Sequence, residues 1–481
     1  MTQRHIAADP MVIDELSRRH QDILDANRPE AVAKQHSRGQ LTARERIEEL
    51  LDAGETLWES GPLAVPVGTG LTAPADGLVI GIGRVHSRPC VIVSCDYTSL
   101  GGSLGITSHA KLTRAMFLAV RYELPVFVLV EGGGARVQEY QSLPSVRPAE
   151  AFGTMARLSG RVPMIGLALG RAFAGHAILL GECDTVIATE TAALGIAGPP
   201  LVKAATGMDL TPEEIGGSQI HSQAGGVERL VRNDREAILE ARLYSAYFFH
   251  RRNEPSYPQQ LSVEDQSLAV GQDDVVNVRQ AVESVVDQGS LFELRSAWAT
   301  GATTAFGRIG GRAVGVIAVG PDEGESILGL TRDHCDKIAR FQSLCQSFGI
   351  PDLRIIGSVR PADDDEGSED ALFRHASRLI QADDANDSMS ITVLVGELVG
   401  VTQTVLGGFS RFLNGPFHFM WPNATLQGLG AGENGTSAYG VAEAFSTDDV
   451  IDPGSTRQTI VDVLNLLDQE SAGTGTPVHV W

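Results

Sequence analysis

The stretch GRVHSRPCVIV, residues 83–93, has a second version later in the chain, GRIGGRAVGVI at residues 307–317. Both read as a glycine-arginine pair, a turn and an apolar strand. Three more landmarks return 226 positions later: Lys111 as Lys337, Pro125 as Pro351, and Gly170 as Gly396. A repeat that keeps its register over such a distance predicts two copies of one domain.

Each copy reads as strand, helix, strand, helix and strand. In the second copy, Ile338, Phe341, Cys345 and Phe348 follow at spacings that place them on one face of a helix. The first copy offers the same face with Leu112, Ala115, Met116 and Ala119. Continuous apolar strands that alternate with helices predict an α/β domain whose sheet is covered on both faces.

The length of 481 residues also favours more than one domain. A polar, proline-containing stretch at residues 251–267, RRNEPSYPQQLSVEDQS, is typical of a linker. We therefore predict an N-terminal domain at residues 1–255 and a C-terminal domain at residues 256–481.

Composition excludes several classes of protein. A formal net charge of −22 argues against a nucleic-acid binder, because phosphate contacts need a basic surface. No run of about 18 apolar residues offers a membrane span, and the first 20 residues lack the apolar core of a signal peptide. The five cysteines are scattered without close metal-type pairs, so a reducing cytoplasm is expected.

Glycines gather where the first copy ends a strand. The apolar run VFVLV (126–130) is followed by EGGGARVQE (131–139). The repeat places SVRPA (358–362) opposite GGGAR (132–136), and GVTQ (400–403) opposite AGHA (174–177). Glycines that only the scaffold needs should survive in both copies. These do not, which indicates that they serve a functional site.

Two glycine turns at neighbouring strand ends can aim backbone N–H groups at one point. Such an oxyanion hole stabilises negative charge that develops on a carbonyl oxygen, for example in a thioester enolate. Glycines at a strand end are also typical of phosphate-binding loops. However, neither GxxxxGK[ST] nor GxGxxG occurs at this strand end, which disfavours a nucleotide site.

Longer motifs resemble a known family, the carboxyltransferase β subunits of biotin-dependent acyl-CoA carboxylases. In the first half these are SRGQLTARERI (37–47), PADGLVIGIGRV (74–85), DYTSLGGSLG (96–105) and GGGARVQE. IAGPPLVKAATG (196–207) and EEIGGSQIHSQAGGV (213–227) are most similar to the methylcrotonyl-CoA and propionyl-CoA members. The second half continues the match with FGRIGGRAVGVIA (306–318), DKIARFQSLCQSFGIP (336–351), WPNA (421–424) and DDVIDPGSTR (448–457).

The resemblance implies two tandem crotonase-like domains of the ClpP/crotonase superfamily. It implies a CoA thioester as substrate in the first half, and carboxybiotin on a separate carrier protein in the second half of a partner subunit. The site would then lie in a homo-oligomer, either a dimer or a trimer of dimers. A biotin carboxylase or carrier subunit is the expected protein partner, since this chain has no lysine within a Met-Lys-Met carrier motif.

The resemblance also assigns residues. By position, Gly133, Gly134, Ala135, Gly175 and His176 match the loops that line the acyl-CoA oxyanion hole. Gly198, Pro199, Pro200 and Lys203 match the loop near the CoA and acyl group. Gly400 and Val401 match the biotin-side loop.

Departures from the family pattern limit the functional prediction. The first glycine loop of the family reads close to DSGGAR, whereas Glu131 and Gly132 stand here, and His176 replaces a glycine. The biotin-side motifs of the second half are largely replaced by SVRPADDDEGSED (358–370) and GELVGVT (396–402). Three hypotheses remain: an acyl-CoA carboxyltransferase, a biotin-independent decarboxylase of a malonyl-type CoA or carrier thioester, and a non-catalytic partner subunit.

His176 is the residue on which these hypotheses differ most. Its imidazole could donate to the oxyanion or protonate a carbanion, or it could turn outward without a role. Glu131 and Glu139 are acid or base candidates only if they point inward, and Arg136 is expected to pair with Glu139 or another carboxylate. His221 is expected to be structural. No HExxH or paired CxxC motif is present, so we predict no metal.

Overall fold

The computed structural model describes residues 9–68, 70–142, 150–249, 275–362, 371–409, 412–413, 415, 417–428, 435–466 and 473–478. The chain divides into two compact units. Unit one comprises Met1–His221 and Leu230–Ser245, and unit two comprises Ser222–Arg229 and Ala246–Trp481. The predicted linker 251–267 and the predicted domain boundary at residues 255 and 256 lie outside the described residues, so that boundary stays a prediction.

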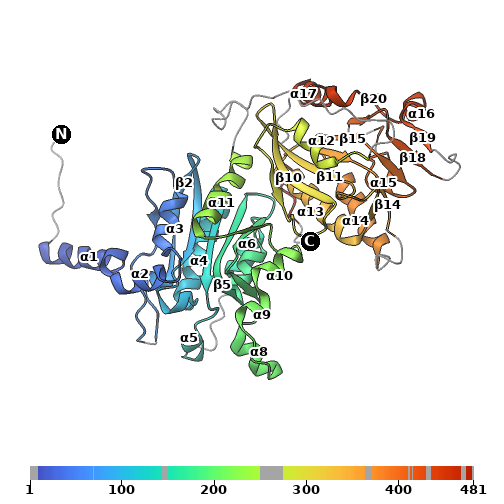
Figure 1. The fold of residues 1–481 in the computed structure, drawn as a ribbon. Helices are drawn as coiled ribbons and strands as arrows, with labels where there is room; N and C mark the ends of the chain where they lie inside the picture. Colours follow the sequence, from blue (N-terminus) through green and yellow to red (C-terminus); the bar gives the residue numbers. More distant parts are fainter. Residues whose placement is uncertain are drawn as a thin grey trace, which may run out of the picture. The chain divides into compact units, whose positions relative to one another are not determined.

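The first sheet contains β1 (Trp58–Glu59), β2 (Leu78–Val85), β3 (Arg88–Cys95), β4 (Val126–Gly132), β5 (Met164–Phe173), β6 (Thr185–Thr189), β7 (Ala193–Gly195) and β8 (Arg229–Val231). Its order is β1-β2-β3-β4-β5-β6-β8, with β7 paired to β5. Figure 1 labels β2 and β5 of this sheet in the blue to green part of the chain. β2 and β3 form an antiparallel hairpin, and β3 to β6 run parallel.

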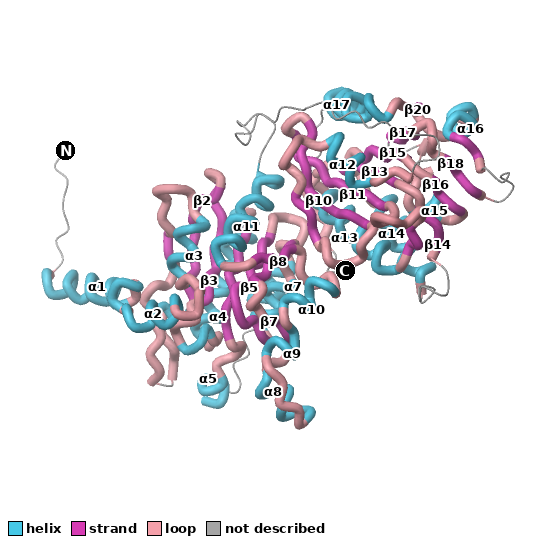
Figure 2. The backbone as a smooth tube through the Cα atoms, in the orientation of Figure 1, coloured by secondary structure: helices cyan, strands magenta, loops and turns pink. Residues whose placement is uncertain are grey.

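The helices of this part of the chain are α1 (Pro10–Asp22), α2 (Pro29–His36), α3 (Ala43–Leu50), α4 (Ile106–Tyr122), α5 (Val137–Ser142), α6 (Glu150–Ala156), α7 (Gly175–Gly181), α8 (Pro199–Thr206), α9 (Pro212–Gly216), α10 (Ser218–Gln223) and α11 (Asp234–Phe249). Figure 2 shows α3, α4 and α7 beside the strands of the first sheet, whereas α1 extends away from it. α3 and α4 both pack against β2 and β3. The predicted face of α4 is confirmed, because it buries Leu112, Ala115, Met116 and Ala119.

β4 is the strand that leads to the glycine stretch. All seven of its residues are buried, in keeping with a central strand covered on both faces. Its apolar residues are β-branched, aromatic or leucine, which suits a pleated strand in a core. The strand ends at Gly132, so the glycine stretch lies at the carboxyl end of a buried parallel strand.

The second sheet contains β9 (Phe292–Leu294), β10 (Ala302–Ile309), β11 (Arg312–Val319), β13 (Asp352–Ile356), β15 (Ser390–Leu394), β17 (Phe417–Met420) and β20 (Asp449–Val450). These strands lie in the order β9-β10-β11-β13-β15-β17-β20. A smaller sheet joins β12 (Leu328–Leu330), β14 (Val359–Pro361), β16 (Glu397–Val399), β18 (Thr425–Gln427) and β19 (Thr436–Ser437). The helices are α12 (Val278–Val285), α13 (Arg332–Ser347), α14 (Leu372–Asp384), α15 (Thr402–Val405), α16 (Ala438–Glu443) and α17 (Thr456–Leu466).

The two large sheets repeat the same order of a hairpin followed by parallel strands. The N–H of Val91 donates to the carbonyl of Pro125 at 2.8 Å, and the N–H of Gly315 donates to that of Pro351 at 2.8 Å. The predicted correspondence of the two prolines is therefore confirmed. The two units are copies of one α/β domain.

A buried lysine makes equivalent hydrogen bonds to backbone carbonyls in both units. Lys111 in α4 donates to the carbonyl of Ala75 at 2.8 Å, and Lys337 in α13 donates to that of Trp298 at 2.7 Å. Burial lowers the pKa of each lysine to about 8. Each ammonium donates hydrogen bonds to buried carbonyls of the segment that precedes its hairpin. These lysines therefore have a structural role.

The glycine stretch and its counterpart also correspond. The N–H of Arg136 donates to the carbonyl of Leu104 at 2.8 Å, and the N–H of Ala362 donates to that of Leu330 at 3.3 Å. The isolated bridge between Leu104 and Ala135 is thus the first-unit form of the β12–β14 pairing. The alignment of GGGAR with SVRPA is confirmed.

The short segment Ser222–Arg229 belongs to unit two for a packing reason. Glu228 forms a buried ion pair with Arg295 at 2.9 Å, and a Cβ on Gly225 would lie 2.6 Å from the ring of Trp298. Among the described helices, none has both the length and the apolar character needed to cross a bilayer.

Candidate functional site: the two glycine turns of unit one

The loop after β4 leaves one N–H group without an acceptor. The N–H of Gly133 donates to the carbonyl of Gly101 at 3.2 Å, and that of Gly134 donates to Nδ1 of His176 at 3.2 Å. The N–H of Ala135 has no acceptor within the described part of the chain. Of the three consecutive residues, only Ala135 can offer its N–H to a ligand.

The turn from β5 into α7 provides the second set of donors. Ala174 has φ 55° and ψ −120°, and its N–H donates to the carbonyl of Gly195 at 2.9 Å. The first helical bond of α7 runs from Ile178 to the carbonyl of Ala174. The N–H groups of Gly175 and His176 therefore find no acceptor among the described residues, as expected for the first turn of a helix.

The two turns touch each other. β4 and β5 are parallel neighbours, and Gly132 pairs with Ala172 at their ends. A Cβ on Gly134 would lie 3.5 Å from both the Cβ of Ala174 and the carbonyl oxygen of Phe173. The structure therefore brings together all five residues predicted for the oxyanion hole: Gly133, Gly134, Ala135, Gly175 and His176.

The three glycines of the loop have different reasons to be glycine. A Cβ on Gly132 would lie 2.5 Å from the carbonyl oxygen of Gly102 and 2.5 Å from Nε2 of His176, so this glycine is required by packing. Gly134 has φ +91°, a backbone conformation that side chains disfavour. A Cβ on Gly133 would meet only the carbonyl oxygen of Gly101, at an ordinary contact distance of 3.9 Å, so packing does not require glycine at this position.

His176 lies beneath the loop as a neutral side chain. It is fully buried, and burial lowers its pKa to about 4, although the carbonyls of Phe173 and Gly102 oppose the shift. Since Nδ1 accepts the N–H of Gly134, the proton of the neutral ring is on Nε2. Nε2 forms no hydrogen bond of good geometry among the described residues, although the carbonyl of Gly102 lies near the ring. At neutral pH this ring is therefore not an imidazolium that could protonate a carbanion.

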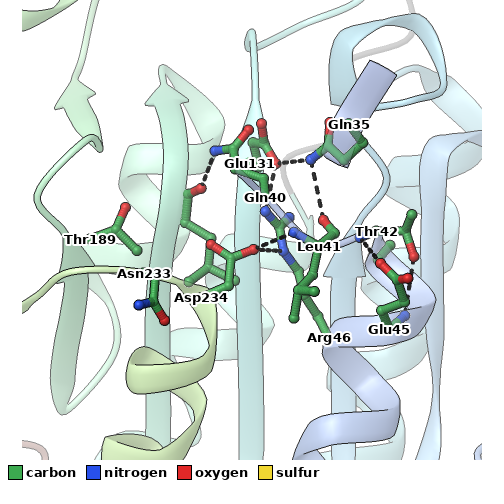
Figure 3. Close-up of polar contacts among 12 residues, drawn as sticks. Gln35, Gln40, Leu41, Thr42, Glu45, Arg46, Glu131, Thr189, Asn233 and Asp234 are labelled. Carbon is green, nitrogen blue, oxygen red and sulfur yellow. Dashed lines mark hydrogen bonds and ion pairs between the residues drawn. The ribbon is translucent and has the colours of Figure 1, made fainter. Parts of the chain in front are cut away.

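Glu131 is held in a buried ionic network (Figure 3). Its Oε2 accepts from Arg46 at 2.7 Å and from Gln35 at 2.8 Å, and Arg38 approaches its Oε1 at 2.9 Å. Arg46 also pairs with Asp234 at 2.8 Å. The side chain is fully buried. Glu131 thus anchors the strand end before the glycines, and the contacts give no support to an acid or base role.

Arg136 and Glu139 form a second buried cluster. Arg136 pairs with Glu139 at 2.6 Å and with Asp76 at 2.5 Å, which confirms the expected carboxylate partner. Glu139 also accepts the N–H of Ile106, at the start of α4, at 2.8 Å. Because both carboxylates are engaged, this cluster fixes the far end of the loop.

The predicted CoA loop lies against the α7 turn. A Cβ on Gly198 would lie 3.5 Å from Cγ of Phe173, which places the start of α8 beside the turn. Pro199 and Pro200 fill the first turn of α8, where a missing N–H costs nothing. Lys203 is exposed and pairs with Asp209 at 2.7 Å. The structure thus brings Gly198 to the site and leaves Lys203 on an exposed helix.

Two side chains at the site have no sequence signal of their own. The ring of His109 in α4 meets that of Phe152 edge-on at 6.3 Å, and a Cβ on Gly175 would lie 3.2 Å from Cζ of Phe152. Burial lowers the pKa of His109. Nothing in the spacing of these residues links them to the glycines, since α4, α6 and α7 meet only in the fold.

His221 and the possible metal ligands are the remaining residues that the sequence analysis considered. His221 contacts the carbonyl of Leu194 through Nε2 at 3.0 Å, in keeping with the structural role expected for it. Within the described residues, no group of three histidine, cysteine, aspartate or glutamate side chains is placed to hold a metal ion.

The corresponding turn of unit two offers fewer donors. Gly400 has φ +60°, like Ala174, and its N–H donates to the carbonyl of Gln427 at 2.7 Å. Val401 is 58% exposed, and its N–H has no acceptor among the described residues. Pro361 stands where Ala135 stands in unit one and has no N–H. The described residues of unit two therefore do not repeat the pair of donors, and the biotin-side assignment of Gly400 and Val401 stays a prediction.

The sequence of this chain is similar to that of a known protein family. Residues 34–434 match the family model of the carboxyl transferase domain. The methylmalonyl-CoA carboxyltransferase 12S subunit of Propionibacterium freudenreichii subsp. shermanii is 29% identical over 505 residues, covering 94% of this chain and 94% of that protein. The biotin-dependent 3-methylcrotonyl-coenzyme A carboxylase beta1 subunit of Mycobacterium tuberculosis is 32% identical over 429 residues, covering 85% of this chain and 78% of that protein.

Solved structures agree with these relatives. A transcarboxylase 12S structure, described as a hexamer assembly with hydrolysed methylmalonyl-CoA bound, has a TM-score of 0.82 at 28% identity and covers 96% of both chains. A single-chain, multi-domain long-chain acyl-CoA carboxylase has a TM-score of 0.84 at 30% identity over 95% of this chain, which spans 49% of that protein. The predicted fold of two tandem crotonase-like domains is confirmed.

Proposed function

Because this chain belongs to the carboxyl transferase domain family of acyl-CoA carboxyltransferases, we propose that it transfers a carboxyl group from carboxybiotin to the α-carbon of an acyl-CoA. Relatives named as biotin-dependent and propionyl-CoA carboxylase subunits support this choice of donor and acceptor. The observation that carries the proposal is the pair of adjacent turns whose N–H groups, on Ala135 and on Gly175 and His176, have no acceptor among the described residues.

The chemistry needs such donors. Loss of the α-proton places negative charge on the thioester oxygen, and fixed N–H groups stabilise that charge without having to reorient. Carboxybiotin would supply the carboxyl group as CO₂ when its N–C bond breaks, and the basic ureido group left behind would accept the α-proton. The nucleophilic α-carbon would then form a C–C bond to that CO₂, which gives the carboxylated thioester. Ala135 and Gly175 are therefore the residues expected to contact the thioester oxygen.

The scaffold favours a fixed geometry for these donors. Glu131 is anchored by Arg46 before the loop, and Arg136 is anchored by Asp76 and Glu139 after it. Buried, paired charges of this kind hold a backbone in one arrangement, because moving either partner would leave an unpaired charge. Donors held in this way need little rearrangement when charge develops.

Decarboxylation of a malonyl-type thioester is less well supported. That reaction needs a proton donor for the enolate, and His176 is the candidate donor. With its pKa lowered to about 4 by burial, His176 is neutral at pH 7. We therefore keep decarboxylation as an outcome of the test and do not propose it. A non-catalytic subunit is the other outcome.

The test combines the purified chain with a biotin carboxylase, a biotinylated carrier, ATP and labelled bicarbonate. Acetyl-, propionyl-, 3-methylcrotonyl- and long-chain acyl-CoA are offered in turn, and label in the thioester is measured. Carboxylation of any of them supports the proposal. Release of CO₂ from malonyl-CoA without biotin or ATP identifies a decarboxylase instead. Neither activity in the presence of the partner proteins identifies a non-catalytic subunit.

Assembly and location are part of the proposal. We expect a homo-oligomer, either a dimer or a trimer of dimers, since the transcarboxylase 12S relative is described as a hexamer. A carrier-borne biotin and an acyl-CoA are the expected partners in the cytoplasm. Light scattering that shows a monomer at micromolar concentration would contradict the proposed homo-oligomer.

A further inference from the structure

One side chain links the two turns of the site. Nδ1 of His176, the second residue of α7, accepts the N–H of Gly134 at 3.2 Å. The ring fills the space that Gly132 leaves, because a Cβ there would lie 2.5 Å from both Cε1 and Nε2 of His176. The histidine is fully buried, so water cannot replace it as the acceptor.

We propose that His176 is a positioning residue that holds the N–H of Gly134 away from the substrate, and thereby fixes the N–H of Ala135 as the donor of this loop. This inference rests on the proposed function only for the statement that the Ala135 N–H donates to a substrate oxygen. The hydrogen bond itself is a property of the unliganded protein.

The loop needs such an acceptor because its backbone is otherwise permissive. Three consecutive glycines can adopt many φ/ψ combinations, and Gly134 already has φ +91°. A buried N–H without an acceptor costs about 1–3 kcal/mol, so without His176 the Gly134 N–H would turn toward any acceptor available. A bound substrate oxygen would be one such acceptor, and the direction of the Ala135 N–H would change with it.

The second unit has a polar contact of opposite polarity at the equivalent position. Thr402 is the residue equivalent to His176, and its single hydroxyl proton lies between the carbonyl of Val399 at 2.9 Å and that of Val359 at 3.1 Å. Val359 lies in the strand-end segment that corresponds to the glycine loop. In both units, therefore, the side chain at this place lies against the loop after the preceding parallel strand, but only His176 offers that loop an acceptor.

The test distinguishes two roles of the His176 side chain: accepting the N–H of Gly134, and filling the space beneath the loop. In His176→Asn, Oδ1 can occupy the place of Nδ1 and accept the same N–H, whereas His176→Leu keeps the volume without an acceptor. We expect His176→Leu to lower kcat about 10- to 100-fold with little change in KM, because it weakens an interaction used in the transition state. His176→Asn should stay within a few-fold of wild type. His418→Leu, which replaces an equally buried histidine of β17, is the matched control and should keep its activity.

A second readout does not depend on turnover. Hydrogen exchange of the Gly134 amide, followed by NMR or by mass spectrometry of the loop peptide, should be slow in wild type and in His176→Asn. It should be at least 10-fold faster in His176→Leu, provided that the far-UV circular dichroism of the variant shows it folded. Equal exchange in wild type and His176→Leu would overturn the proposal. If wild type carboxylates no thioester while the exchange pattern holds, the proposed function fails and the positioning role stands.

Discussion

Ala135 of unit one and Pro361 of unit two occupy the same place in the repeated fold. Each is followed by a residue whose N–H donates to an equivalent carbonyl, that of Leu104 at 2.8 Å or that of Leu330 at 3.3 Å. Ala135 has an N–H without an acceptor among the described residues, whereas proline has none. The second unit therefore shows that this position accepts proline without loss of the local pairing.

This relationship yields a test of the oxyanion hole. Ala135→Pro removes one backbone N–H and adds little volume. Proline restricts the residue before it, but that residue is Gly134, which has the conformational freedom of a glycine. If the N–H stabilises the enolate, kcat for carboxylation should fall about 10²- to 10³-fold. Ala135→Gly keeps the N–H and serves as the control. An Ala135→Pro variant as active as Ala135→Gly would exclude Ala135 as a donor.

Backbone strain at the α7 turn makes a second prediction. Ala174 has φ 55°, where its counterpart in unit two, Gly400, is a glycine at φ +60°. Ala174→Gly should relieve backbone strain of about 1 kcal/mol, and Gly400→Ala should introduce about as much, because a positive φ disfavours a residue with a Cβ. The new Cβ at position 400 would meet no atom within 4 Å, so no steric clash adds to this strain. The melting temperature should therefore rise in the first variant and fall in the second. Shifts of the same sign would contradict this account.

The ionic network before the glycine loop should be sensitive to loss of either partner. Arg46 is fully buried between Glu131 at 2.7 Å and Asp234 at 2.8 Å. Arg46→Met leaves two buried carboxylates without their shared cation, which should cost about 3–5 kcal/mol in urea unfolding. Glu131→Gln should cost less, because Arg46 keeps Asp234.

The control for this series is an exposed ion pair. Glu15 pairs with Arg19 at 2.6 Å on the surface of α1, and Glu15→Gln should leave the urea midpoint unchanged. If Arg46→Met unfolds at the same urea concentration as Glu15→Gln, the network does not hold the strand end.

The buried His176 predicts a specific dependence of stability on pH. Its pKa falls from 6.5 to about 4 on folding because burial disfavours the imidazolium. Between those values the unfolded chain binds a proton that the folded chain does not, so stability decreases as the pH falls through this window. From pH 7 to pH 5 the loss should be about 2 kcal/mol. His176→Asn should abolish that part of the loss, as measured by urea unfolding at both pH values. His20→Gln, on exposed α1, should retain it.

The repeat and the strand pattern were sufficient to predict the fold. Pro125 and Pro351 keep their spacing, and the same hydrogen bond to each proline carbonyl appears in both units. The helix faces were also readable, because burial of every third or fourth residue is a property of the helix itself. These features are local or periodic, so they can be read from the sequence without coordinates.

The donors of the site could be predicted only as a group. The sequence indicated that Gly133, Gly134, Ala135 and Gly175 lie near one another, because neighbouring parallel strands end at the same edge. It could not show which N–H groups are already used. Gly101 lies far from Gly133 in the chain and takes its N–H, a pairing that exists only once the loops have packed.

Sequence alone therefore determined the two α/β copies and their register, since repeated spacing and apolar periodicity can be read along the chain. It also predicted that the two glycine turns lie close together. Tertiary structure decided the roles of individual groups. It buried His176 beside Gly132, lowered its pKa and gave Nδ1 the N–H of Gly134. It also committed Glu131 to Arg46. Charge state and hydrogen-bond availability depend on which atoms surround a group, and those atoms come from segments that are distant in sequence.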